Sequence, residues 1–342
     1  MSIKYSNIVN AIALLGAVAF ISCKRSSTSD DLWKSPLIPE DFPEAFYPVD
    51  FDTVSQKEIQ LGRELFYDPI LSIDSTLSCA SCHNQASAFA DPGVAISPGV
   101  NGELGVRNTP TITNLAWHPS YMADGGIAHL NLVPIAPITT FFEMNSSLEG
   151  TMERLNSSAY QNSFERIYGV EVIRTKELMK ALTAFQLTLV SDQSKWDAVQ
   201  RGTAEFSAAE LQGEELFMEN CASCHVPPLF SDFTFANNGI DSVFTDQGRG
   251  RITGQAEDIG RFKIPSLRNI ALTFPYMHDG RFASLNEVLE HYGRSNYDAS
   301  ADDRVIQIGV LTQDEKHYLV EFLHTLTDNA IVSTTKLGNP HE

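Results

Sequence analysis

The sequence is short of positive charge. Its 24 Lys and Arg residues stand against 43 Asp and Glu residues, for a formal net charge of −19 at pH 7. An acidic surface repels the phosphate backbone of nucleic acids and anionic lipid heads, so the charge balance argues against nucleic acid as a partner. Such a surface either steers a basic partner toward the protein or serves solubility alone.

Strand signals are also weak throughout the sequence. Two segments instead place apolar residues on one helical face, KELMKALTAFQLTLVS at 176–191 and LTQDEKHYLVEFLHTL near the end. Ser207 with Glu210 and Thr312 with Glu315 have the spacing of capping boxes, which mark helix starts. The sequence therefore predicts a mostly α fold with long irregular loops and argues against a sheet protein.

The apolar run near the start of the chain is short for a membrane helix. AIALLGAVAFIS follows Lys4 and ends before Cys23, which is typical of a lipoprotein signal peptide over residues 1–22 with lipid on Cys23. An ordinary signal peptide near a cysteine and a single-span anchor are the alternatives. Residues 23–45 are polar and proline-rich and predict a tether. We expect a periplasmic protein held by lipid, on the outer membrane.

Cysteine is rare, and its placement is specific. Four of the five cysteines lie in the pentapeptide CASCH, at 79–83 and again at 221–225. C-x-x-C-H is the haem c attachment motif, in which both thiols bond the haem vinyl groups and the histidine ligates the iron. A zinc site made of two C-x-x-C knuckles is the rival, but it leaves both histidines unexplained. The motif predicts two haem c groups, held by Cys79, Cys82, His83, Cys221, Cys224 and His225.

The two motifs lie within a longer internal repeat. LGRELF (61–66) precedes the first motif and QGEELF (212–217) the second, while TPTITNLAWHPSYMADGGIAHL (109–130) matches IPSLRNIALTFPYMHDGRFASL (264–285). The repeat is far longer than a solenoid unit. It predicts two cytochrome c-like haem domains related by internal duplication, spanning 46–200 and 201–330, followed by a tail over 331–342.

Several further segments carry a family resemblance. FADP (89–92), RNTPTITN, PIAPITTFFEM, AFQLTLVS (184–191), PSLRNIALTFPYMHDG and HYG (291–293) accompany the two CASCH motifs. From about Lys57 to Asp328, the chain resembles the bacterial diheme cytochrome c peroxidases, and within them the MauG-like branch. The resemblance implies a peroxidatic N-terminal haem, an electron-transfer C-terminal haem and a calcium ion between the domains.

The activity that the resemblance implies is the reduction of hydrogen peroxide to water. Electrons would come from a small c-type cytochrome or a similar carrier, and the protein could form a homodimer. A MauG-like oxidase that modifies a partner protein and a non-enzymatic diheme electron carrier are the alternatives, since haem c domains host all three roles.

The resemblance assigns roles around the first haem. Glu143 falls at the position of the family's catalytic glutamate, a general acid and base. No His or Met occurs from 84 to 117, where many members carry a loop histidine that blocks the iron, so we expect an open first haem. His118 is the nearest alternative ligand. Two positions depart from the family: Val133 replaces a common Gln, and Ala123 replaces the Trp that lies between the haems.

The resemblance also assigns the second haem and the calcium ion. Tyr292 falls where conventional members have the methionine ligand, as in the MauG-like branch; Met277 is a rival ligand, and a core role for Tyr292 is the other alternative. The calcium ligands would be the Asn108 side chain and the backbone carbonyls of Thr273 and Pro275, oxygen ligands of the kind that calcium prefers. The alternative is that these segments only form turns.

Overall fold

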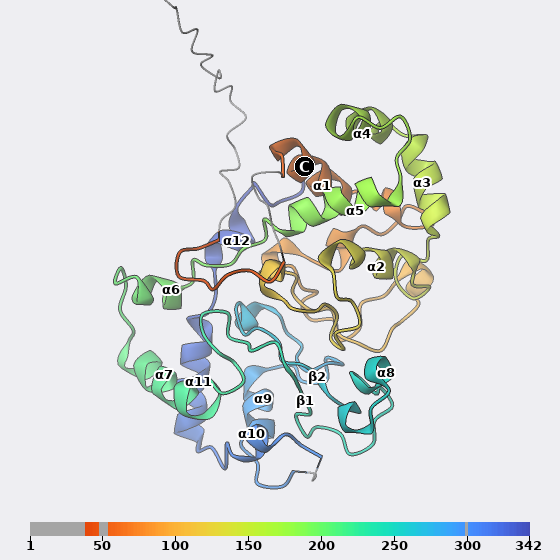
Figure 1. Cartoon of the computed structure of the whole chain (residues 1–342). Helices are drawn as coiled ribbons and strands as arrows, with labels where there is room; N and C mark the ends of the chain where they lie inside the picture. The colour runs from red at the N-terminus through yellow and green to blue at the C-terminus, as the bar shows by residue number, and fades with distance from the viewer. Residues whose placement is uncertain (1–37, 48–53, 298–299) are drawn as a thin grey trace, which may run out of the picture.

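The computed structural model describes residues 38–47, 54–297 and 300–342, and there the fold is mostly α, as predicted. β1 and β2 form a small antiparallel sheet in which Phe235 lies opposite Lys263. None of the described helices is long and apolar enough to cross a membrane. In this part of the chain the helices and strands of Figure 1 are α1 (Gln56–Tyr67), α2 (Ile135–Thr139), α3 (Leu148–Asn156), α4 (Tyr160–Tyr168), α5 (Thr175–Gln186), α6 (Lys195–Gln200), α7 (Ala208–Asn220), β1 (Phe235–Ala236), α8 (Gly250–Thr253), β2 (Phe262–Lys263), α9 (Leu285–Tyr292), α10 (Asp303–Ile306), α11 (Gln313–His324) and α12 (Asn329–Ser333).

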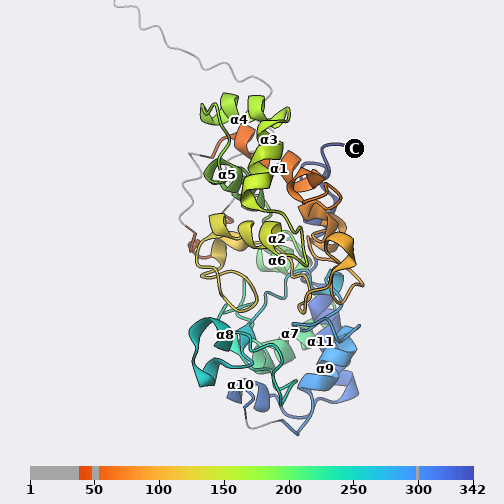
Figure 2. The ribbon, with the colours of Figure 1, turned by 90° about the vertical axis from the view of Figure 1, so that its right-hand side faces the viewer.

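The helices gather in two halves, with α1 to α5 in one and α7 to α11 in the other (Figures 1 and 2). Each half is built on one close helix pair, α1 against α5 and α7 against α11. A Cβ on Gly62 would lie 1.9 Å from the carbonyl oxygen of Ala181, and one on Gly213 would lie 2.0 Å from that of Tyr318. The glycines of LGRELF and QGEELF therefore allow both helix crossings.

The predicted capping boxes are confirmed. Ser207 and Glu210 bond each other's backbone N–H at the start of α7, and Thr312 and Glu315 do the same at the start of α11. Each pair satisfies two backbone donors that the first helical turn leaves unbonded.

The repeated segments adopt the same local geometry. Asn114 and Asn269 are both left-handed, with φ of 57° and 62°. Asn114 Oδ1 accepts a hydrogen bond from the backbone N–H of Ser191 at 2.8 Å, and Asn269 Oδ1 accepts one from that of Asp328 at 2.8 Å. Each asparagine thus fixes the chain that leaves α5 or α11. Descent of the two halves from one duplicated unit stays a prediction.

Both ends of the described chain pack on the folded part. Phe42, inside the predicted tether, is buried against Trp117, whose indole N–H donates to the carbonyl of Pro43 at 2.8 Å. The predicted tail returns to the N-terminal half, where Arg63 Nε donates to the carbonyl of Gly338 at 2.7 Å and Leu337 is buried. The tail thereby joins the two halves. Cys23 and the signal peptide lie outside the described residues.

Candidate functional site

The first CASCH motif holds its histidine in a form that can ligate a metal. The backbone N–H of His83 donates to the carbonyl of Cys79 at 3.0 Å, which closes the motif into a tight turn. The ring Nδ1–H donates to the carbonyl of Phe89 at 2.9 Å, so Nε2 carries the free lone pair. Burial lowers the pKa of His83, which keeps the ring neutral. A neutral imidazole with free Nε2 is the form that ligates iron.

The second motif repeats this arrangement. His225 N–H donates to the carbonyl of Cys221 at 2.9 Å, and its Nδ1 lies 3.1 Å from the carbonyl oxygen of Phe230 and 3.2 Å from that of Pro265. Burial again lowers the pKa of the histidine. Phe89 and Phe230 both present these carbonyls from left-handed backbone, with φ of 62° and 53°.

The residues around both motifs fit haem c. The four thiols are free, and partly buried apolar side chains such as Leu267, Phe282 and Val288 lie in the core cluster that includes Cys221. Among the described residues, no three His, Cys, Asp or Glu side chains are arranged to hold a metal ion. The motif at 79–83 lies against α1 in one half, and the motif at 221–225 follows α7 in the other.

Glu143 lies beside the first motif. Its backbone N–H donates to the carbonyl of Thr140 at 3.0 Å, and its carbonyl accepts from Val100 at 2.8 Å. The carboxylate has no hydrogen-bond partner among the described residues, and burial raises its pKa. Its charge adds to the burial that raises the pKa of the Cys79 and Cys82 thiols, which places the carboxylate close to both. The role of Glu143 as an acid–base residue at the first haem stays a prediction.

His118 lies at the boundary between the halves. Its ring contacts Phe233 with centroids 4.4 Å apart, and its Nδ1 lies 3.4 Å from Nζ of Lys263. Its Nε2 is buried without a hydrogen-bond partner among the described residues. His118 thus contacts the C-terminal half through Phe233 and Lys263 and also stacks on Tyr121 of its own half. The open first haem stays a prediction.

Both candidate sixth ligands of the second haem meet at Asn238. Burial raises the pKa of Tyr292 to about 12, while the nearby Asn238 side chain acts to lower it and the thiols of Cys221 and Cys224 are near enough to contribute. Nδ2 of Asn238 also lies 3.2 Å from the Met277 sulfur. Sequence reasoning missed Asn238, because nothing in FANNGI (235–240) signals a contact with residues 277 and 292.

The predicted calcium ligands lie where the halves meet. Asn108 donates its backbone N–H to the carbonyl of His278 at 2.8 Å, and its Nδ2 donates to Val94 and Ala95 at 3.1 and 3.0 Å. Its Oδ1 and the carbonyl oxygens of Thr273 and Pro275 accept no hydrogen bond from the described residues. Free oxygens suit calcium, which stays a prediction.

An ion-pair network that the sequence did not signal also joins the halves. Arg107 lies 2.7 Å from Asp124 and 2.6 Å from Asp246, and Arg251 lies 3.0 Å from Asp124. The carbonyl of the neighbouring Ala123 accepts from the Lys263 N–H at 2.7 Å. The position where the family has Trp therefore lies against β2.

Beside Ala123, two rings of the C-terminal half stack. The Phe262 and His278 rings have centroids 4.2 Å apart and planes 14° apart. Arg107 lies over the Phe262 ring at 5.6 Å from its centroid. The boundary beside Ala123 thus contains stacked rings although it lacks the Trp.

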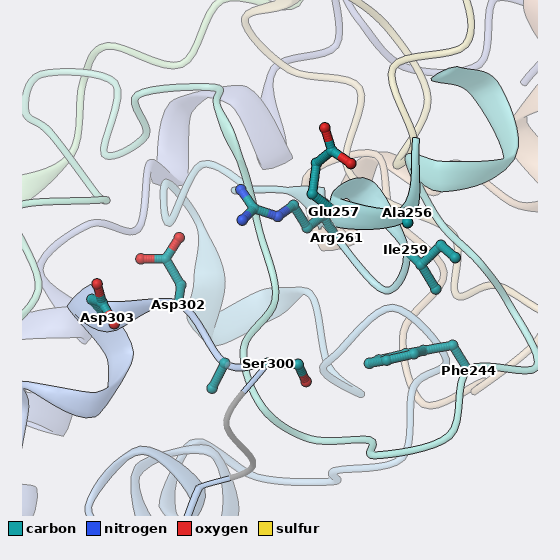
Figure 3. A pocket seen from close by; sticks show the side chains of 9 residues that line it. Phe244, Ala256, Glu257, Ile259, Arg261, Ser300, Asp302 and Asp303 are labelled. Atoms are coloured by element: carbon teal, nitrogen blue, oxygen red, sulfur yellow. The ribbon is translucent and has the colours of Figure 1, made fainter. Parts of the chain in front are cut away.

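A pocket of about 550 Å³ opens elsewhere in the C-terminal half (Figure 3). None of the predicted site residues lines it. Its wall comes from the loops before β2 and the start of α10, with Phe244, Glu257, Ile259, Arg261, Asp302 and Asp303 among the lining residues.

Comparisons with known proteins identify the family. The profile of the family described as di-haem cytochrome c peroxidase matches residues 56–205. The methylamine utilization protein MauG of Methylorubrum extorquens is 33% identical over 83% of this chain and 82% of its own length. The cytochrome c551 peroxidase of Nitrosomonas europaea is 32% identical over 78% of this chain and 79% of its own length.

A solved structure agrees as well. The crystal structure of a MauG-like protein associated with microbial copper homeostasis superimposes with a TM-score of 0.83, at 32% identity, over 91% of this chain and all of that one. With two haem-attachment motifs in a mostly α fold, the chain belongs to the diheme cytochrome c peroxidase family, which includes MauG-like members.

Proposed function

We propose that the chain is an exported peroxidase that reduces hydrogen peroxide to water at the first haem site. A small c-type cytochrome or a similar carrier would deliver the electrons through the second haem. One observation carries the proposal: the carboxylate of Glu143 lies beside Cys79 and Cys82 without a hydrogen-bond partner among the described residues. Such a group favours an enzyme over a non-enzymatic electron carrier.

The chemistry needs a proton carrier as well as electrons. Reduction of one peroxide breaks the O–O bond, consumes two electrons and two protons, and releases two waters. Cys79, Cys82 and His83 would hold the haem, which would supply the redox-active iron. Glu143 takes a proton from one peroxide oxygen and returns it to the other, a role worth ~10²- to 10⁴-fold in rate. Its raised pKa suits a group that both accepts and releases a proton.

The proposal also covers the cellular location of the enzyme and a bound calcium ion. The signal-like segment before Cys23 supports lipid anchoring in the periplasm, on the outer membrane. The unbonded oxygens of Asn108, Thr273 and Pro275 support one calcium ion between the halves.

A MauG-like oxidase that modifies a partner protein is the second candidate. Its support is the position of Tyr292 beside Cys221 and Cys224, together with relatives named MauG and a MauG-like structural relative associated with copper homeostasis. A phenol oxygen on the second haem would lower its potential relative to a thioether and help to store oxidising equivalents.

The test is peroxide turnover by the protein carrying both haems, with a reduced monohaem cytochrome c as donor. We expect two cytochromes to be oxidised for each peroxide consumed. Peroxide consumption without cytochrome oxidation, accompanied by a mass change in an added partner protein, would favour the MauG-like candidate. Absence of peroxide consumption would overturn both enzymatic candidates.

A further inference from the structure

The loop that follows β1 holds one side chain against both candidate ligands of the second haem. The loop is rigidly fixed by Asn237, which is 3% exposed, donates Nδ2 to the carbonyl of Ser300 at 3.1 Å and accepts from the Gly239 N–H at 2.9 Å. The next residue, Asn238, is half-buried and faces α9.

The orientation of the Asn238 amide is determined by its neighbours. Its Oδ1 accepts from the backbone N–H of Ile240 at 3.1 Å, and its backbone carbonyl accepts from Nε2 of the buried His291 at 2.9 Å. Because the amide oxygen is engaged, the NH₂ group must point the other way. The bond from His291 also ties Asn238 to the last turn of α9, which carries Tyr292.

The NH₂ group donates to the sulfur of Met277, which lies 3.2 Å from Nδ2. The hydroxyl of Tyr292 is near enough for the same side chain to act on its pKa. A thioether is a weak acceptor, whereas an oxygen that bonds a metal keeps a lone pair for a hydrogen bond and gains from a donor. The same amide therefore favours the oxygen as a ligand and restrains the sulfur.

We propose that Asn238 is the positioning residue that selects the sixth ligand of the second haem, holding the Tyr292 oxygen toward the iron and keeping the Met277 sulfur away. This inference rests on the proposed function, since it requires haem at Cys221 and Cys224 and ligation by Tyr292. Met277 is itself fixed: its φ is 74°, and its carbonyl accepts from the Gly280 N–H at 3.2 Å. Release of its sulfur therefore depends on the amide rather than on a change of backbone.

The test uses protein that carries both haems, confirmed by intact mass. Asn238→Asp keeps the Oδ acceptor for Ile240 but replaces the donor with a second acceptor, which removes the hydrogen bond to the Met277 sulfur and any donation to a ligating Tyr292 oxygen. We expect the low-spin spectrum of the second haem to change and its midpoint potential to rise, with the first haem unaltered. Asn286→Asp, the same change at an exposed position of α9, is the matched control and should leave both unchanged.

A second variant covers the case in which Asn238→Asp does not take up two haems. Asn238→Ser has a side chain too short to reach residues 277 and 292, and it should shift the potential in the same direction. If sulfur then ligates the iron, the long-wavelength charge-transfer band of sulfur-ligated ferric haem should appear in either Asn238 variant and disappear on adding Met277→Leu.

Tyr292→Phe tests ligation by Tyr292 separately from the role of Asn238. An unchanged second haem in Tyr292→Phe would remove Tyr292 ligation, and with it the basis of the inference, while peroxide turnover would still test the enzyme. A changed second haem in Tyr292→Phe, with unchanged spectrum and potential in both Asn238 variants, would overturn the role of Asn238 alone.

Discussion

Single buried residues decide both chemistry and stability in this protein. The motif histidines were predictable because C-x-x-C-H requires its residue types at fixed spacing. The contacts that hold the Glu143 backbone were not, because they come from Gly99 and Val100, which pack against residues 142 and 143 from a distant loop. A carboxylate's burial follows from such tertiary contacts and not from its neighbours in sequence.

The buried ion pair of Arg268 and Asp197 shows how a single residue affects the free energy of unfolding. Both side chains are fully buried, with Nη2 2.7 Å from Oδ1. Asp197→Asn should lower the free energy of unfolding by roughly 3 to 5 kcal/mol, because it leaves the guanidinium buried without its counter-charge. Chemical denaturation at pH 7 measures this. Lys195→Met, which breaks the partly exposed pair with Glu210, is the control and should cost about 1 kcal/mol or less.

The pH dependence of this pair has a definite sign. Burial acts to raise the pKa of Asp197, but the bonds from Arg268 and Ser194 outweigh it, so the pKa is lowered in the folded protein. The stabilisation is therefore present above the unfolded pKa of about 3.9 and is lost as pH falls through the folded value. The difference between wild type and Asp197→Asn should shrink in acid; a constant difference would contradict the ion-pair explanation.

At the scale of helices and strands, the sequence predicted which segments form helices better than it predicted which segments contact each other. Helical periodicity and capping boxes placed α5, α7 and α11, since both signals are local. The carbonyls that the repeated glycines approach could not be read from sequence, because Ala181 and Tyr318 lie more than a hundred residues away. The packing of the last residues on the first half was missed for the same reason.

The helix crossings give a direct prediction. Gly62→Ala places a Cβ against the carbonyl of Ala181, which α5 cannot move without disturbing its own hydrogen bonds. We expect a loss of roughly 1 to 3 kcal/mol in the free energy of unfolding, and a similar loss for Gly213→Ala. Gly150→Ala in α3, where a Cβ would meet only side-chain atoms, is the control and should change stability by about 1 kcal/mol at most. Equal effects at all three positions would refute the close crossings.

At the scale of the whole molecule, two halves meet at a boundary rich in ion pairs and carry one motif each. The repeat in the sequence indicated the two halves. Their mutual placement depends on Arg107, Asp124 and Asp246, whose pairing has no local signal.

Two haems, one per half, are therefore expected to attach independently. Intact-mass analysis of protein matured with the haem c machinery should show two haem additions. Cys79→Ala should weaken or abolish attachment in the N-terminal half and leave the second haem in place, because the two motifs lie in different halves. One addition in wild type, or loss of both haems in the variant, would contradict independent sites.

The iron of the first haem is expected to have an open coordination position in the fully oxidised protein. Because 84–117 contains no His or Met, the fully oxidised protein should show a high-spin first haem and react with peroxide without prior reduction. Electron paramagnetic resonance and stopped-flow absorbance measure both properties. A wholly low-spin oxidised spectrum, with a lag that only pre-reduction removes, would indicate an additional ligand such as His118.

The central claim is that Glu143 carries the proton in peroxide reduction, and Glu143→Gln tests it most directly. Because burial raises the Glu143 pKa, stability should fall as pH rises through the window between its unfolded and folded values; the neutral variant escapes this loss and should fold at least as well at pH 7. With both haem spectra intact, steady-state peroxide turnover with a reduced cytochrome c should fall by ~10²-fold or more, about 3 kcal/mol of barrier, while the exposed Glu149→Gln control keeps wild-type turnover. Full turnover in Glu143→Gln would contradict the account.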